Sequence, residues 1–132
     1  MKNEKTKVLV VFEDGRVPLE AIAKRMKTSL VDKAQVKARC ASEVAVAEIL
    51  AADAYAFGVS DASAPAWTEI KRLFQGMNLA GRKAAFFSEK RAQADGLKAS
   101  FAPTELAVGG ADLIAGEADG AEAWIQALIA AR

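Results

Sequence analysis

The chain has 132 residues, with 18 basic and 17 acidic side chains, one Cys and no His. The lack of His excludes a Ser-His-Asp triad, a Cys-His pair and a His-bearing metal site, and one Cys cannot form an internal disulfide or hold an iron–sulfur cluster. The length predicts a single domain over residues 1–132. No apolar run approaches the ~20 residues that span a bilayer, and the apolar run at residues 8–12 is too short for a signal-peptide core, so we expect a cytoplasmic protein.

Charge is spread unevenly along the chain. Residues 1–39 carry ten basic and five acidic side chains, a net charge of +5, and residues 40–132 carry a net charge of −4. This asymmetry indicates either a first helix with a basic solvent face or a docking patch for an acidic partner. The near-neutral total does not indicate a nucleic-acid partner, and we expect no membrane partner either.

The first half of the chain alternates predicted strands and helices. Residues 8–12 (VLVVF) form an apolar run typical of a strand buried on both faces, and a turn follows at Glu13-Asp14-Gly15. Apolar residues at helical spacing then predict a helix from Pro18 to Lys33. A short edge strand over 35–39, an Ala-rich helix over 44–52 and an apolar strand over 54–59 follow.

The second half continues the alternation. A polar loop over 60–64 leads to a helix that starts at Pro65, and residues 84–88 (AAFFS) predict a fourth strand. A helix around 92–100, a short fifth strand over 112–115 and a last helix beginning near Asp119 complete the pattern. Five strands alternating with five helical segments predict an α/β fold, with a parallel sheet and helices on both faces.

Three segments, taken in order, resemble the flavodoxin family. Residues 50–58 (LAADAYAFG) resemble its third strand, residues 79–88 (LAGRKAAFFS) its fourth strand with the preceding turn, and residues 104–116 (TELAVGGADLIAG) the approach to its fifth strand. The resemblance covers essentially the whole chain. It implies a three-layer flavodoxin-like fold with a five-stranded parallel sheet in the order 2-1-3-4-5, and a ligand crevice at the carboxyl ends of strands 1 and 3.

The resemblance also implies that FMN, where it is bound, contacts three loops at this carboxyl edge. The matching positions are Glu13, Asp14, Gly15, Arg16 and Val17 in the first loop, Ser60, Asp61 and Ala62 in the second, and Ser88, Glu89 and Lys90 in the third. We take these as the candidate cofactor-binding residues, and we assign no catalytic or metal-binding residue.

The first loop departs from the family pattern. Flavodoxins bind the FMN phosphate there through hydroxyl side chains and backbone N–H groups at a helix N-terminus. Residues 12–18 contain no Ser or Thr, and Glu13 and Asp14 bring two negative charges. Pro18 lacks an N–H group, which leaves Arg16 as the compensating cation. We therefore expect the usual phosphate contacts to be lost.

The other two loops lack the aromatic residues that flank the flavin ring in the family. Residues 60–64 contain none, unless Trp67 folds back from its helix, and residues 88–96 contain none. The single Tyr, Tyr55, falls within a predicted strand and is expected to be buried. Trp67 is likewise expected to pack in the core, as is Trp124.

Three functional interpretations remain open. The first is a flavodoxin-like binding or regulatory module that binds a protein partner or a small anionic ligand at the carboxyl edge, where Lys90 and Arg91 could join Arg16. The second is a divergent flavodoxin that binds FMN and transfers electrons. The third is a receiver-like phosphoacceptor.

The receiver-like interpretation rests on acidic residues that follow the strands. Glu13 and Asp14 would hold Mg²⁺, Asp61 would accept the phosphoryl group, and Ser88, at the end of strand 4, would be the Ser or Thr that a receiver has there. The Lys expected after strand 5 is absent, because Ala115-Gly-Glu117 stands there. Separately, Cys40 is interpreted as a partly buried, inert thiol or as a reactive one; the adjacent Arg39 should point to the opposite face of its strand.

Overall fold

The computed structural model describes residues 6–29, 34–77, 81–90, 93–101, 107–108, 113–114 and 124. The described strands are β1 (Thr6–Phe12), β2 (Ala34–Cys40), β3 (Ala54–Val59), β4 (Lys83–Ser88), β5 (Ala107–Val108) and β6 (Leu113–Ile114). All neighbouring strands pair in parallel, in the order β2-β1-β3-β4-β5. This confirms the predicted strand order.

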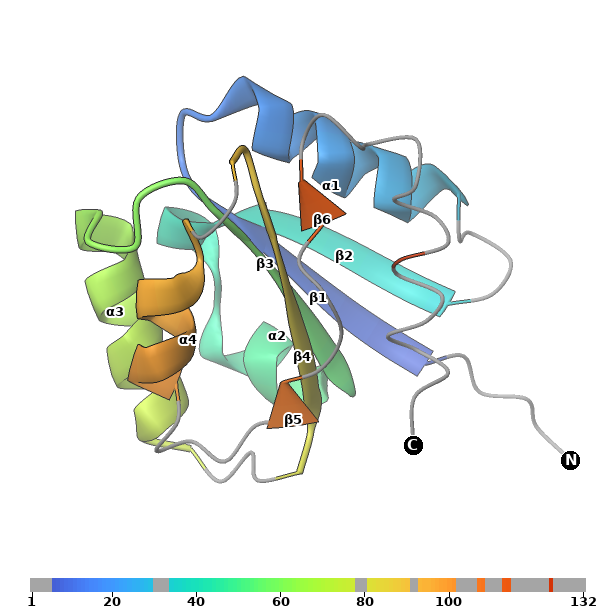
Figure 1. The fold of residues 1–132 in the computed structure, drawn as a ribbon. Helices are drawn as coiled ribbons and strands as arrows, with labels where there is room; N and C mark the ends of the chain where they lie inside the picture. Colours follow the sequence, from blue (N-terminus) through green and yellow to red (C-terminus); the bar gives the residue numbers. More distant parts are fainter. Residues whose placement is uncertain are drawn as a thin grey trace, which may run out of the picture.

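Helices cover both faces of the sheet (Figure 1). The described helices are α1 (Val17–Ser29), the 3₁₀ turn η1 (Ala41–Glu43), α2 (Val46–Ala51), α3 (Pro65–Gln75) and α4 (Asp95–Phe101). α1 lies on one face, and α2, α3 and α4 lie on the other. The result is the three-layer α/β fold that the alternating pattern predicts. Within the described part of the chain, no helix is long and apolar enough to cross a membrane.

Side-chain alternation along β1 divides the core into two. Val8 and Val10 pack with the α1 face, and Leu9 and Val11 pack with the face under α2, α3 and α4. The second core is mainly aromatic. Phe57 is at its centre, with the ring centroids of five other aromatic residues 4.9–6.3 Å away, namely Tyr55, Trp67, Phe74, Phe86 and Phe101.

The fifth position of the sheet is occupied by two short strands. β5 pairs with the beginning of β4, at Lys83 and Ala84, and β6 pairs with its end, at Phe87 and Ser88. The sequence predicts a short strand over 112–115 and misses the first piece, because two residues are too few to give a periodic pattern.

Several helix boundaries differ from the predicted ones. α1 is described to Ser29, and the predicted extension to residue 33 lies outside the described residues. α2 begins two residues later than predicted, after η1. Similarly, α4 begins at Asp95 rather than near residue 92. The predicted start of the last helix, near Asp119, is outside the described residues, although Trp124 packs with its ring centroid 6.0 Å from that of Phe87.

At the amino end of the sheet, a guanidinium group holds the end of α2. Nη1 of Arg82 donates hydrogen bonds to the carbonyl oxygens of Leu50 (3.0 Å) and Ala52 (2.8 Å) and to the Tyr55 hydroxyl (3.1 Å). The buried Tyr55 hydroxyl in turn donates to the Ile49 carbonyl (2.6 Å). These contacts satisfy carbonyl groups that a helix end otherwise leaves without partners.

Candidate functional site

The carboxylate of Glu13 joins two loops at the carboxyl edge of the sheet. Glu13 directly follows β1 and is only 4% exposed. Its Oε1 atom accepts hydrogen bonds from the Ser60 amide (2.8 Å), the Asp61 amide (2.7 Å) and the Trp67 indole Nε1 (3.1 Å). Its Oε2 atom accepts one from Nε of Arg16 (3.2 Å). The donors of the β3–α3 loop are therefore taken by a side chain of the protein itself.

Backbone pairing explains the direction of this side chain. The Glu13 amide donates to the Gly58 carbonyl at 2.9 Å, which extends the β1–β3 pairing by one residue beyond Phe12. Gly58 also lets the sheet pack tightly, because a Cβ atom there would lie 2.5 Å from the Phe87 ring. The end of β1 is thus held close to the end of β3, within reach of the β3–α3 loop.

Asp14 points away from Glu13, toward the end of β2. Its carboxylate accepts hydrogen bonds from the amide (3.0 Å) and the hydroxyl of Ser42. Partial burial acts to raise the pKa of Asp14, but the hydrogen bonds from Ser42 outweigh it and the pKa is lowered. The following residue, Gly15, has φ +76°, a left-handed turn conformation that glycine adopts without strain.

The second and third loops are also linked to each other. The Ser60 hydroxyl donates a hydrogen bond to Oε1 of Glu89, which connects the β3–α3 loop to the residue after β4. Asp61 is exposed, and hydrogen bonds from the Ser63 hydroxyl (2.6 Å) and amide (3.0 Å) lower its pKa. Ala62 is half-buried against the aromatic core.

The remaining predicted positions of the third loop divide between the interior and the surface. Ser88 is fully buried at the end of β4, and within the described residues its hydroxyl has no hydrogen-bond partner. Lys90 is exposed, and its amide donates to Oε1 of Gln93 (2.7 Å). Arg91 lies outside the described residues. The structure therefore gathers Glu13, Ser60 and Glu89 into one network, and it brings Asp61 in through its backbone.

This geometry does not favour the receiver-like interpretation. Glu13 and Asp14 bind to different loops, and the Asp61 carboxylate is engaged by Ser63. Across the described ranges, no three acidic or Cys side chains form a group that could hold a metal ion. The paired carboxylates that would bind Mg²⁺ do not converge.

Cys40, at the end of β2, lies in an environment that opposes ionisation. Burial, a hydrogen bond with Glu43 and the nearby Asp14 charge raise its pKa to about 11, despite the opposing hydrogen bond with Ser42. Arg39 instead points to Glu48, with Nε 2.9 Å from Oε2. These observations support the interpretation of Cys40 as an inert thiol.

The first turn of α1 differs from the helix-terminus phosphate site that the family uses. Among the first four residues of α1, Pro18 has no N–H group, and the amides of Leu19 and Glu20 donate to the Arg16 carbonyl (3.1 and 3.0 Å). Arg16, the expected phosphate partner, is paired with Glu13. The first turn therefore offers the Val17 amide but neither the hydroxyl groups nor the set of free N–H donors that a helix-terminus phosphate site uses.

The sequence alone did not show that Glu13 would bind Ser60, Asp61 and Trp67. A Glu directly after a buried strand indicates a position at the edge of the sheet. It does not indicate which loop the carboxylate contacts. The partnership of Asp14 with Ser42 was also missed. Both depend on contacts between residues 28 to 54 positions apart.

Comparison with known proteins places the fold but not the function. No protein-family model and no curated protein matches the sequence. Among solved structures, oxidised flavodoxin 2 from Bacillus cereus is similar with a TM-score of 0.76 and 17% identity, over 93% of this chain and 97% of that one. A flavodoxin from Streptococcus pneumoniae TIGR4 has a TM-score of 0.75 and 15% identity over the same shares.

Two-electron reduced Megasphaera elsdenii flavodoxin is similar with a TM-score of 0.69 and 18% identity, over 89% of this chain and 98% of that one. These structural similarities show that the chain has the flavodoxin-like fold, as the resemblance in the sequence predicts. At identities below 20%, they extend to the architecture, and the chemistry must be argued from this chain's own residues.

Proposed function

We propose that this chain is a flavodoxin-like binding module that contacts a protein partner through its carboxyl edge, without the phosphate contacts by which flavodoxins hold FMN. The observation that carries the proposal is the buried Glu13 carboxylate, which occupies the N–H donors of Ser60, Asp61 and Trp67. The proposal assigns no catalytic residue.

Electrostatics opposes a phosphate at the first loop. A phosphate placed there would lie beside Glu13 and Asp14, and each repulsion would cost about 1–4 kcal/mol at 4 Å, depending on the effective dielectric. Moving Glu13 aside would leave the part-buried amides of Ser60 and Asp61 and the buried Trp67 indole without this acceptor, and an unsatisfied buried donor costs about 1–3 kcal/mol.

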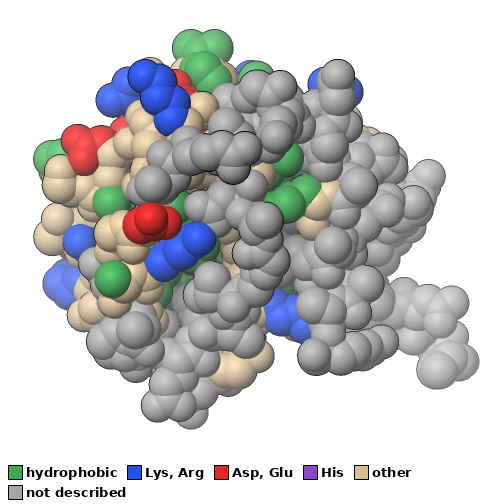
Figure 2. All heavy atoms as spheres, in the orientation of Figure 1, with side chains coloured by type: hydrophobic (Ala, Val, Ile, Leu, Met, Phe, Trp, Pro, Cys, Tyr) green, Lys and Arg blue, Asp and Glu red, His purple; other side chains and the backbone are tan. Residues whose placement is uncertain are grey.

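The exposed part of this edge suits a protein surface. Val17 is 74% exposed at the start of α1, and Arg16, Asp14 and Asp61 are exposed around it. Figure 2 shows apolar, basic and acidic side chains gathered over the start of α1. Protein interfaces commonly have an apolar centre and a polar, solvent-accessible rim.

A divergent flavodoxin that binds FMN through other contacts is the second candidate. The observation in its favour is the extent of the likeness, which covers 93% of this chain and 97% of the Bacillus cereus flavodoxin. In that case FMN would supply the electron-transfer chemistry, and the chain would supply binding and orientation.

Titration of the purified protein against FMN, followed by flavin fluorescence, distinguishes the two candidates. The proposal predicts a colourless protein and no saturable quenching up to high micromolar FMN. A yellow preparation with stoichiometric flavin, or saturable quenching, would contradict the proposal and favour the divergent flavodoxin.

The partner contact is tested with a matched pair of variants. Val17→Asp places a charge at the carboxyl edge, and Val46→Asp places one on α2, where Val46 is 44% exposed. A partner captured from an extract by the unaltered protein should be lost with Val17→Asp and retained with Val46→Asp. Equal retention by both variants would show that the partner binds elsewhere.

A further inference from the structure

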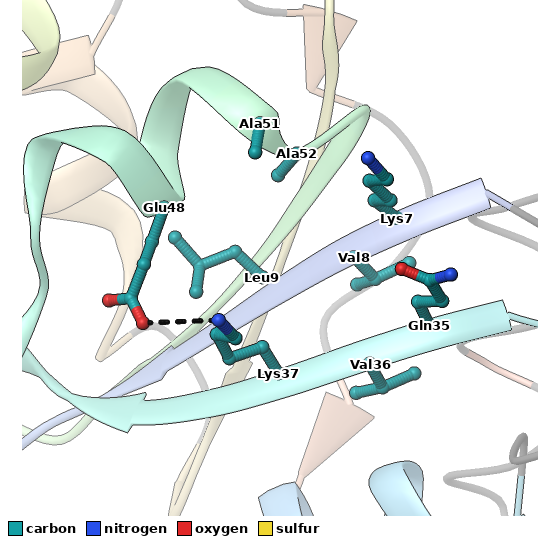
Figure 3. Close-up of a pocket in the computed structure, with 9 residues that line it drawn as sticks. All are labelled: Lys7, Val8, Leu9, Gln35, Val36, Lys37, Glu48, Ala51 and Ala52. Carbon is teal, nitrogen blue, oxygen red and sulfur yellow. Dashed lines mark ion pairs between the residues drawn. The ribbon is translucent and has the colours of Figure 1, made fainter.

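Away from the three loops, a hollow lies on the face of the sheet that carries α2; we call it the α2 hollow. Its volume is about 290 Å³, and β1, β2 and the C-terminal end of α2 surround it (Figure 3). The lining residues are Lys7, Val8, Leu9, Gln35, Val36, Lys37, Glu48, Ala51 and Ala52. This volume is at the small end of the range for ligand pockets.

Strand register and helix length explain why this hollow exists. Lys7 is opposite Gln35 and Leu9 is opposite Lys37 in the parallel β1–β2 pair, so these four side chains share one face. α2 has six residues, and Gln35 and Lys37 on the edge strand remain exposed beside it. A short helix thus leaves part of the sheet face uncovered.

The hollow combines a small apolar surface with cationic side chains. Leu9, Ala51 and Ala52 supply the apolar part. Lys7 and Lys37 extend from neighbouring strands, and Figure 3 shows Lys37 directed toward Glu48.

The positive charge of this hollow is only partly neutralised. Glu48 accepts a hydrogen bond from Nε of Arg39 at 2.9 Å, and Nζ of Lys37 is 3.6 Å from it. The lining therefore carries two positive charges and one negative charge, and the adjoining Arg39 adds a third positive charge. The Asp53 carboxylate accepts a hydrogen bond from the Lys7 amide (2.9 Å).

The C-terminal end of α2 lies beside the hollow, and its effect on a bound anion is reduced by Arg82. The C-terminal end of a helix carries partial negative charge. Here Arg82 binds the carbonyl oxygens of Leu50 and Ala52 and offsets that charge.

We propose that this hollow binds a small organic acid with a compact apolar body. The carboxylate would lie between Lys7 and Lys37, and the apolar body would lie against Leu9, Ala51 and Ala52. A second copy of the chain is a poor occupant, because it would bring the same basic face against itself. The site is separate from the carboxyl edge, so it stands or falls independently of the function proposed above.

Binding is tested on the full, isotopically labelled chain with two matched probes, 2-naphthoate and the neutral 2-naphthalenemethanol. Two-dimensional amide NMR should show naphthoate-induced shifts at residues 7–9, 35–37 and 48–52. Loss of a charge-assisted contact weakens binding by about tenfold, so we expect naphthalenemethanol to bind at least about tenfold more weakly than naphthoate.

The variants give a second, independent readout. The double variant Lys7→Gln/Lys37→Gln should weaken naphthoate binding by about tenfold or more, whereas Lys27→Gln, on the exposed side of α1 at the other face, should leave it unchanged. Equal binding of the two probes, shifts centred on the carboxyl-edge loops, or unchanged affinity in a folded double variant would each overturn the proposal. If the double variant fails to fold, the probe comparison on the unaltered chain decides.

Discussion

Glu13 gathers N–H donors from two loops and from α3 onto a single carboxylate. One carboxylate oxygen receives two backbone amides and an indole N–H, and the other receives Arg16. Hydrogen bonds to an ionised group are stronger than those between neutral groups. The arrangement therefore stabilises the two loops at the same time as it occupies their donors.

Glu13→Ala should lower the free energy of unfolding by about 2–3 kcal/mol, because the part-buried amides of Ser60 and Asp61 and the buried Trp67 indole lose their acceptor. Urea denaturation measures the change. The control is Glu20→Ala, which removes an exposed ion pair with Lys24 (3.1 Å) and should cost less than about 0.5 kcal/mol. Equal losses in the two variants would show that the Glu13 contacts add nothing to stability.

Cys40 provides a test of local electrostatics through its reactivity. Its pKa is raised to about 11 in the folded chain, so the thiolate that reacts with iodoacetamide is scarce at pH 8. Compared with an unfolded Cys of pKa about 8.5–9, the thiolate fraction should be lower by about a hundredfold. We expect slow alkylation in buffer, accelerating as the pH rises toward 11, and fast alkylation in urea. Similar rates in buffer and in urea at pH 8 would refute the raised pKa.

At the scale of elements, α2 depends on contacts outside itself. A helix of six residues is too short to be stable alone. Ile49 is buried in the aromatic core, and Arg82 and Tyr55 bind carbonyl groups at the helix end. The residue before β4 thus fixes the position of α2, which borders the α2 hollow.

Arg82→Met should lower the free energy of unfolding by about 1–3 kcal/mol, because the carbonyl groups of Leu50 and Ala52 and the Tyr55 hydroxyl lose a charged donor. Arg72→Met is the matched control, since Arg72 is exposed on α3 and pairs with Glu69. Thermal unfolding compares the two variants. A loss in Arg82→Met no greater than in Arg72→Met would contradict the proposed role of Arg82.

The central strands were predicted well because a continuous apolar run is stable only where both faces of the strand are buried. β3, residues 54–59, has the predicted bounds and is buried along its whole length. The start of α2 was less predictable. The Ala45 amide donates to the Glu48 side chain (3.1 Å), which fixes a helix start at a residue type that rarely caps helices. The split of the fifth strand left no periodic signal.

The sequence predicted which residues follow the strands at this edge, but it did not predict the contacts between them. Following the strands to their carboxyl ends identified Glu13, Ser60 and Glu89 as neighbours at one edge. The hydrogen bonds among them depend on the β1–β3 pairing and on the position of Trp67, which the sequence does not specify. In the sequence, the only sign of the basic character of the α2 hollow was the excess of positive charge in residues 1–39.

In the whole molecule, two surfaces of different character lie at different places on the sheet. At the carboxyl edge, Ser60 donates hydrogen bonds to Glu13 and to Glu89, which connects the loops that follow β1, β3 and β4. Toward the amino end, on the α2 face, Lys7 and Lys37 border a partly apolar hollow. A fold shared with flavodoxins therefore supports one edge whose donors are occupied and a separate surface that is open to an anion.

Hydrogen exchange measured by NMR tests directly whether Glu13 accepts hydrogen bonds from the donors of the carboxyl edge. The amides of Ser60 and Asp61 and the indole N–H of Trp67 should be protected in the unaltered chain. In Glu13→Ala they should exchange at least about tenfold faster than in Arg82→Met, which is destabilised at the opposite end of the sheet. Equal exchange of these three groups in the two variants would contradict the account.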